Sequence, residues 1–122
     1  MYAYILTDKE TYLTNAYRNM DYILGRNATG FCYVTGLGTK SPEHPHHRLS
    51  ASDDIKAPIP GFLVGRPNPG QQDKAFYPTA SPDESYVDTE DSYASNEVAI
   101  NWNAALVALS SSLDALAVDS VK

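Results

Sequence analysis

Glycine and proline are confined to the middle of this chain, and this distribution constrains the fold more than any other feature. All 7 glycines and all 8 prolines lie between Gly25 and Pro82. Proline has no backbone N–H and clashes with the preceding helical turn, and glycine is entropically costly inside a helix. The sequence therefore predicts two ends that can form helices and a middle segment that cannot be regular helix.

The first end has the pattern of an amphipathic helix from about Lys9 to Leu24. Its apolar residues recur at helical spacing, at Leu13, Ala16, Tyr17, Met20, Ile23 and Leu24. Thr7 and Glu10 have the spacing of a capping box, and Asp8 is an alternative N-cap. Gly25 can adopt the left-handed conformation that ends a helix.

The second end predicts a longer helix, from about Ser92 to Val118. One apolar stripe runs along it, formed by Val98, Trp102, Ala105, Leu109, Leu113 and Leu116. We expect this helix to pack one face and to expose the other.

The segment between the two helices is about 60 residues long, whereas loops beyond about 12 to 15 residues are uncommon in a compact domain unless they are functional. Two helices cannot enclose a core of their own, and residues 2–6 resemble the end of an earlier apolar helix. We therefore expect residues 1–122 to be an incomplete domain of mainly α class, in which the long segment carries function.

Composition narrows the class of partner. The formal net charge is −6 with only 9 Lys and Arg residues, which argues against nucleic acid and suits a neutral substrate. Cys32 is the only cysteine, so neither an intrachain disulfide nor a thiolate-based zinc site is expected. The apolar start of the chain is too short for a signal peptide or a membrane span, so no membrane partner is expected.

Four carboxylates gather around the start of the second predicted helix, at Asp88, Glu90, Asp91 and Glu97. Burial and neighbouring negative charge raise a carboxyl pKa, whereas a helix amino terminus lowers it. Glu97 should lie deepest in the helix, where desolvation favours the protonated form that a general acid needs. Asp88 should stay ionised, to accept hydrogen bonds from sugar hydroxyls or to hold a positioning residue. The alternative is a solvated acidic helix start with ordinary capping.

A second polar cluster consists of His44, His46, His47 and Arg48. If this segment is extended, His46 and Arg48 lie on the same face, because alternate residues of a strand do. Zinc binding is an alternative, but Pro45 restricts the backbone and no well-spaced fourth ligand follows. A third interpretation is local hydrogen bonding by the histidines, which suits His44 and His47.

Both clusters resemble the two defining motifs of the family 9 glycoside hydrolases, inverting cellulases built on an (α/α)6 toroid. The second motif agrees at Tyr86, Asp88, Tyr93, Glu97, Ala99, Asn103 and Ala104. The first agrees at Val34, Thr35, Gly38, Lys40, Pro45, His46 and Arg48, while Cys32 stands where the family usually has Ser, Thr or Val. The likeness extends over essentially all 122 residues, as the carboxy-terminal part of the catalytic domain.

The resemblance implies a role for each candidate residue. Glu97 corresponds to the general acid, Asp88 and His46 to further active-site residues, and Arg48 to a companion of His46 in the substrate cleft. Among the aromatic residues Tyr33, Phe76, Tyr77, Tyr86, Tyr93 and Trp102, we expect Tyr93 to line the cleft and Trp102 to be core. No cofactor and no metal are expected among the site residues.

The family's catalytic base, an aspartate in an Asp-Ala-Gly-Asp segment, has no counterpart in this sequence. Asp53 and Asp54 form the nearest pair, but in the wrong context. We therefore expect the chain to carry the acid half of a site that hydrolyses β-1,4-glucosidic bonds in cellulose or related glucans, completed by an amino-terminal part. The resemblance alone implies that the enzyme is secreted or periplasmic. The alternative is a non-catalytic carbohydrate-binding or assembly module.

Overall fold

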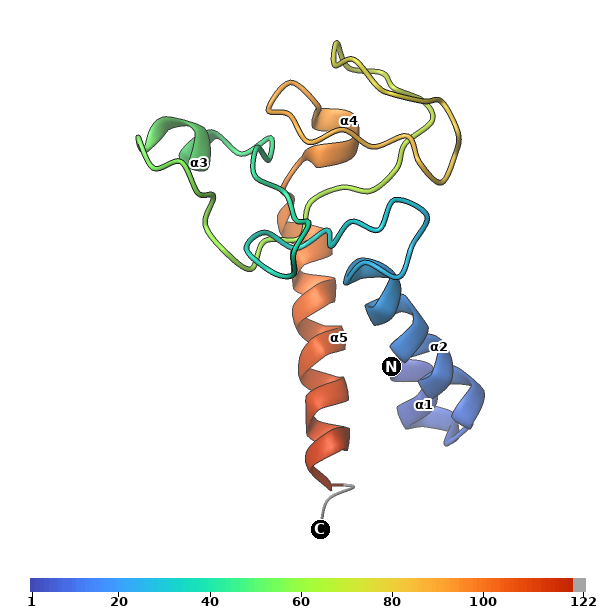
Figure 1. Cartoon of the computed structure of the whole chain (residues 1–122). Coiled ribbons are helices and arrows are strands. Elements are labelled where there is room, and N and C mark those ends of the chain that lie inside the picture. Colours follow the sequence, from blue (N-terminus) through green and yellow to red (C-terminus); the bar gives the residue numbers. More distant parts are fainter. Residues whose placement is uncertain (120–122) are drawn as a thin grey trace.

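A computed structural model describes residues 1–119 of the chain. Helices are the only regular elements in this part: α1 (Tyr2–Thr7), α2 (Glu10–Ile23), α3 (Arg48–Ser52), α4 (Tyr93–Asn96) and α5 (Ile100–Asp119). The helices α1, α2 and α5 lie together on one side, and the irregular segment gathers beyond the start of α5 (Figure 1). Within residues 1–119, no helix is long and apolar enough to cross a membrane.

The first predicted helix is confirmed as α2, within one residue at each end. Gly25 follows it with a φ of 113°, in the region that favours glycine, as predicted. The predicted capping box is wrong, because Thr7 belongs to α1 and its hydroxyl donates to the Ala3 carbonyl. Asp8 ends α1 in a left-handed conformation, and Lys9 is the N-cap of α2 without a side-chain hydrogen bond.

The second predicted helix is broken, so the expectation of one helix from Ser92 to Val118 is wrong. The short helix α4 is capped by Ser92, whose hydroxyl accepts from the Ser95 N–H at 3.2 Å. It ends at Glu97, which has an extended backbone, and α5 begins three residues later. Glu97 and Val98 pair with chain segments far away in sequence, and these hydrogen bonds replace those of a continuous helix.

The middle segment is irregular, as its glycines and prolines predict. Its only helix is α3, and isolated bridges take the place of strands in the described residues. These bridges connect four passes of the chain into a narrow ladder, by pairing Val34 with Leu63, Val64 with Val98, and His46 with Glu97.

The buried core lies in this ladder rather than between the helices. It consists of Cys32, Tyr33, Val34, Leu63, Val64 and Tyr86. Trp102 packs against this cluster and its indole N–H donates to the Leu63 carbonyl at 3.1 Å, so its predicted place in the core is confirmed.

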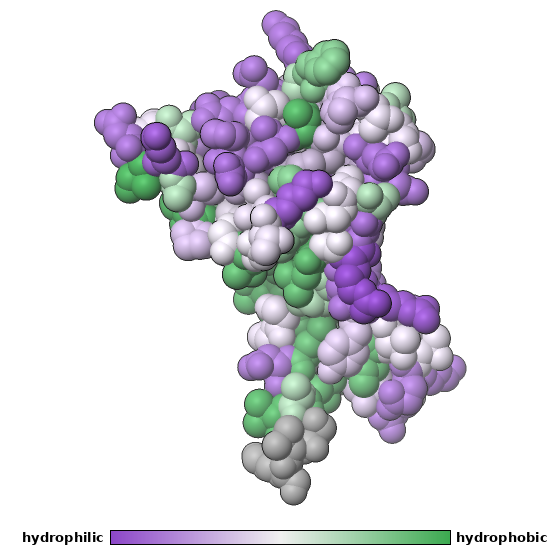
Figure 2. Space-filling view, in the orientation of Figure 1, coloured by the Kyte–Doolittle hydropathy of each residue, from purple (hydrophilic) through white to green (hydrophobic). Residues whose placement is uncertain are grey.

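The helix α5 packs the face of its apolar stripe and exposes the opposite face, as predicted, but the exposed face also carries apolar residues. Leu113 is buried, but Ile100, Val107 and Val118 on the same helix are mostly exposed. Hydrophobic residues gather along α5, while hydrophilic residues dominate the loops (Figure 2). A helix that is apolar on several faces is typical of one covered by other helices.

Candidate active site

His46 and Glu97 are neighbours in the ladder, although 51 positions separate them in sequence. The His46 N–H donates to the Asn96 carbonyl at 2.9 Å, and the Val98 N–H donates to the His46 carbonyl at 3.4 Å. These two bonds make His46 and Glu97 a parallel bridge pair, whose side chains project from the same face of the ladder. Both side chains are partly exposed.

The imidazole of His46 is held in one orientation. Its Nδ1 lies within hydrogen-bond distance of the Glu90 carbonyl oxygen. A carbonyl only accepts, so Nδ1 carries the hydrogen and Nε2 is left for another partner. The ring also meets Tyr93 edge to face, with centroids 6.2 Å apart. Tyr93 is 47% exposed and its hydroxyl donates to the Gln72 carbonyl at 2.8 Å.

Asp88 holds the backbone of the segment that leads to His46. Its two carboxylate oxygens accept from the N–H of Glu43 at 2.8 Å and from that of His44 at 3.0 Å. Asp88 also accepts from the Asn96 side chain at 3.0 Å. Of the two roles considered for Asp88, binding sugar hydroxyls and holding a positioning residue, these hydrogen bonds fit the second, because they hold the segment that leads to His46.

Asn96 is a site residue that sequence reasoning missed. Its side chain is fully buried and donates to the His44 carbonyl at 2.8 Å, while its Oδ1 accepts from the Tyr86 hydroxyl at 2.7 Å. Burial, followed by the charge of Asp88, raises the pKa of Tyr86, so this hydroxyl remains a donor. The only sequence signal for Asn96 is its position next to Glu97.

Glu97 does not lie inside a helix, which corrects the expected basis for its protonation. It is the residue that ends α4, with φ −72° and ψ 144°. Its backbone carbonyl accepts from the Gly65 N–H at 2.9 Å. The predicted position of Glu97 inside the helix, next to its apolar stripe, is therefore wrong.

Arg48 and His47 have different positions from their neighbour His46. His47 caps α3 because its Nδ1 accepts from the Ser50 N–H at 3.4 Å, and the same nitrogen lies 2.9 Å from the Ser50 hydroxyl. Its ring packs on Phe62 with centroids 5.0 Å apart. This is the local hydrogen bonding considered for His47. Arg48 begins α3, and its exposed side chain makes no hydrogen bond or ion pair within the described residues.

Of the remaining aromatic candidates, some are buried in the core and one lies on the surface. Tyr33, Tyr77 and Tyr86 are buried, whereas Phe76 is 88% exposed.

The zinc interpretation gains no support, since residues 1–119 contain no group of three His, Cys, Asp or Glu side chains that could hold a metal ion.

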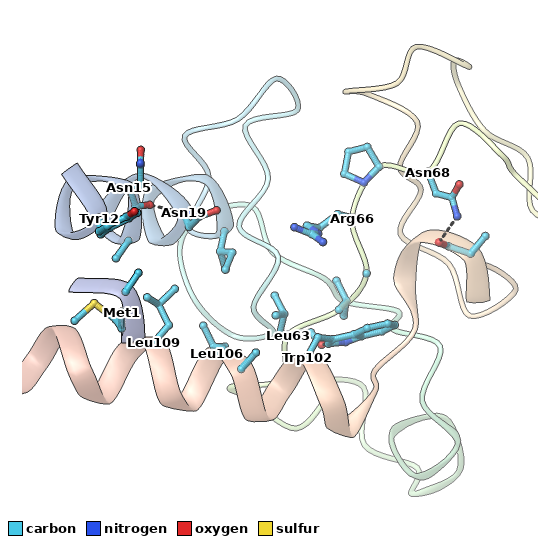
Figure 3. Close-up of a pocket in the computed structure, with 18 residues that line it drawn as sticks. Met1, Tyr12, Asn15, Asn19, Leu63, Arg66, Asn68, Trp102, Leu106 and Leu109 are labelled. Carbon is cyan, nitrogen blue, oxygen red and sulfur yellow. Dashed lines mark hydrogen bonds between the residues drawn. The ribbon is translucent and has the colours of Figure 1, made fainter. Parts of the chain in front are cut away.

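A cavity of about 610 Å³ lies away from these residues, between α2, α5 and residues 63–68 (Figure 3). Its walls are mainly apolar, with Leu63, Trp102, Leu106 and Leu109, and the Arg66 side chain extends toward α2. None of the candidate site residues lines it. The cavity marks a face of α2 and α5 that side chains of residues 1–119 do not fill.

Comparison with known proteins gives one family. The family description "Glycosyl hydrolase family 9" matches residues 1–110. A xyloglucan-specific endo-β-1,4-glucanase of Bacteroides ovatus is 90% identical over 122 residues, which are 100% of this chain and 21% of that protein. Endoglucanase D of Acetivibrio thermocellus is 41% identical over 102 residues, covering 84% of this chain and 14% of the relative.

Solved structures agree with these relatives. A Bacteroides ovatus GH9 structure superposes with a TM-score of 0.83 at 82% identity, over 95% of this chain and 19% of that one. The structure of AaCel9A in complex with cellobiose-like isofagomine gives 0.77 at 44% identity, over 82% of this chain and 20% of that one. The chain thus spans about a fifth of the length of the Bacteroides ovatus relative. On this evidence, the chain belongs to glycosyl hydrolase family 9.

Proposed function

We propose that this chain is the carboxy-terminal part of an (α/α)6 catalytic domain that hydrolyses β-1,4-glucosidic bonds in xyloglucan or a related glucan. The observation that carries the proposal is the pairing of His46 with Glu97 on one face of the ladder. The substrate class rests on the 90% identity to the Bacteroides ovatus xyloglucan-specific enzyme. Because such a polymer is too large to enter a cell, we place the enzyme outside the cytoplasm.

Glu97 acts in this proposal as the general acid. It donates a proton to the glycosidic oxygen as the bond from that oxygen to the anomeric carbon breaks. His46 donates or accepts a hydrogen bond to a sugar hydroxyl through Nε2, since Nδ1 is engaged by Glu90. Tyr93 offers its half-exposed ring to a sugar face, and Arg48 its unpaired guanidinium to hydroxyl groups. Asp88 keeps the His46 segment in place.

The base that completes an inverting reaction comes from outside these residues. In such enzymes the base carboxylate stands about 6.5 to 9.5 Å from the acid and activates the water that attacks the anomeric carbon. Two features support further helices around the chain, namely the unfilled cavity beside α2 and the exposed apolar faces of α5. We assign both to the packing of the rest of the toroid.

The proposal is tested in a chimera, in which these 122 residues replace their counterpart in the Bacteroides ovatus relative. Glu97→Gln keeps the shape of the side chain but cannot deliver a proton, so turnover of xyloglucan should fall by about 100- to 10,000-fold. Hydrolysis of a dinitrophenyl oligosaccharide should fall far less, because its leaving group needs little protonation. Equal losses on both substrates would show that Glu97 is not the acid. Binding of xyloglucan without any turnover by the unmutated chimera would favour the non-catalytic alternative.

A further inference from the structure

The peptide backbone around Glu97 is held from both sides by hydrogen bonds to other segments of the chain. On one side, the Gly65 N–H donates to the Glu97 carbonyl at 2.9 Å. On the other side, the His46 N–H donates to the Asn96 carbonyl at 2.9 Å. A third tie comes from the Asn68 side chain, which donates to the Ala94 carbonyl in α4 at 3.0 Å (Figure 3).

Gly65 leaves no room for a side chain. A Cβ added to it would lie 2.5 Å from the Ser95 carbonyl oxygen, 2.7 Å from the Ser95 carbonyl carbon and 3.3 Å from the Asn96 nitrogen. These are backbone atoms, so no side-chain rotation can relieve the clash. Gly65 does not have a positive φ, and its requirement for glycine is therefore one of space. An alanine at this position must displace the segment that ends in Glu97.

Asn96 fixes the opposite side through its side chain. Its NH₂ group donates to three oxygens. These are the His44 carbonyl at 2.8 Å, the Asp88 carboxylate at 3.0 Å and the Thr89 carbonyl at 3.4 Å. The site is fully buried, so a shorter residue would leave these acceptors without their donor. The backbone and the side chain of Asn96 thus bind the same segment, residues 44–46, on which His46 lies.

We propose that Gly65 and Asn96 are positioning residues for the proton donor, which together set the place of Glu97 relative to the glycosidic oxygen. The proposal rests on the assignment of Glu97 as the general acid. A proton donor acts only within hydrogen-bond reach of its target, and a displacement of about 1 Å can reduce the rate by about 100-fold. Displacing Glu97 should therefore impair the substrates that need protonation more than those that do not.

The test compares two glycine substitutions in the chimera, Gly65→Ala and Gly61→Ala. Gly61 is the matched control, because it has a φ of 92° and no atom within 4 Å of an added Cβ. Alanine strains the backbone at this position but its Cβ clashes with no other atom. Gly65→Ala should reduce kcat on xyloglucan by about 10- to 100-fold, and should reduce it on the dinitrophenyl oligosaccharide by no more than about 3-fold. Gly61→Ala should reduce both activities by the same factor.

Asn96→Ser is a second test variant. Serine is smaller than asparagine and introduces no clash, so the proposal can still be tested if Gly65→Ala does not fold. It should show the same preference for the activated substrate. Losses that are equal on both substrates for the folded variants would overturn the positioning role. If Glu97→Gln itself loses equally on both substrates, the assignment of the acid fails first, and this outcome is distinct from a failure of the positioning residues alone.

Discussion

The irregular segment and the helices differ in how far their side chains are buried and hydrogen-bonded within this chain. The irregular segment contains nearly all the buried residues, including the polar Thr35 and Ser85, and α4 adds Ser95 and Asn96. No buried side-chain nitrogen or oxygen in the described residues lacks a hydrogen-bond partner. The longer helices α2 and α5 have only Ala16 and Leu113 as buried hydrophobic residues.

The buried core of this chain lies in its irregular segment rather than between its helices, which is the reverse of the usual arrangement. Helices normally supply the core and loops run over the surface. In this chain the loop-like part has its own core and hydrogen-bond network, so it can hold the site geometry, whereas the helices leave apolar faces open.

The largest expected effect on stability lies in the irregular segment. Tyr86→Ala in the chimera should reduce the free energy of unfolding by about 3 to 5 kcal/mol, because it removes a buried ring from the core. It also removes the hydrogen bond to Asn96. Phe76→Ala is the control, since Phe76 is aromatic, 88% exposed and lies in the irregular segment rather than on the open faces of α2 and α5, and it should change stability by no more than about 0.5 kcal/mol. Denaturant unfolding measures both, and similar losses would contradict a core in this segment.

A smaller effect tests the open faces of the helices. Val107 in α5 is 65% exposed. If the proposed toroid covers it in the chimera, Val107→Ala should cost about 1.5 to 2 kcal/mol of unfolding free energy, from the two lost methyl groups. A cost below about 0.5 kcal/mol is the value for a solvent-exposed position. That result would mean that this face of α5 remains open in the whole enzyme.

The smallest effect concerns Asp73, which ties the irregular segment to the start of α4. Burial raises the pKa of Asp73, but hydrogen bonds from the Ala94 N–H, the Tyr77 hydroxyl, the Ala75 N–H and the Ser92 hydroxyl outweigh it, and the net pKa is lowered. A lowered folded-state pKa gives stability that is present above the unfolded value of about 3.9. This stability is lost as the pH falls through the lower, folded value.

Asp73→Asn should therefore reduce stability by about 1 kcal/mol at neutral pH, because the amide replaces one accepting oxygen with a donor. The difference between Asp73→Asn and the unmutated chimera should shrink as the pH falls from about 6 towards 3. Thermal unfolding at a series of pH values measures this. A difference that is constant over the series would contradict the lowered pKa.

Local patterns were sufficient to predict much of the fold. The helical spacing from Leu13 to Leu24 predicts α2, and the confinement of glycine and proline predicts the irregular segment. The break after Asn96 could not be predicted in this way, because the apolar stripe of α5 begins at Val98 and continues the helical period through it. The break depends on pairing with His46 and Val64, which are distant in sequence.

The same limit applies to the candidate site. Its titratable members, His46, Asp88 and Glu97, were predicted from the two motifs. Gly65 and Asn96 were not. The space next to Gly65 is limited by Ser95, which is 30 residues away, and the shortest hydrogen bond of the Asn96 side chain is to the carbonyl of His44, which is 52 residues away. The predicted capping box failed for a related reason, because Thr7 is used by the preceding helix.

The most direct test of the account is complementation between two polypeptides, this 122-residue chain and the remainder of the Bacteroides ovatus relative. The account predicts that neither releases reducing sugar from xyloglucan alone, since an acid without a positioned base and water leaves the inverting reaction incomplete. The mixture should be active, and Glu97→Gln in the shorter chain should abolish this activity. Turnover by the 122-residue chain alone that disappears in its Glu97→Gln variant would contradict the account, because a base within these residues, such as Asp53 or Asp54, would then complete the site.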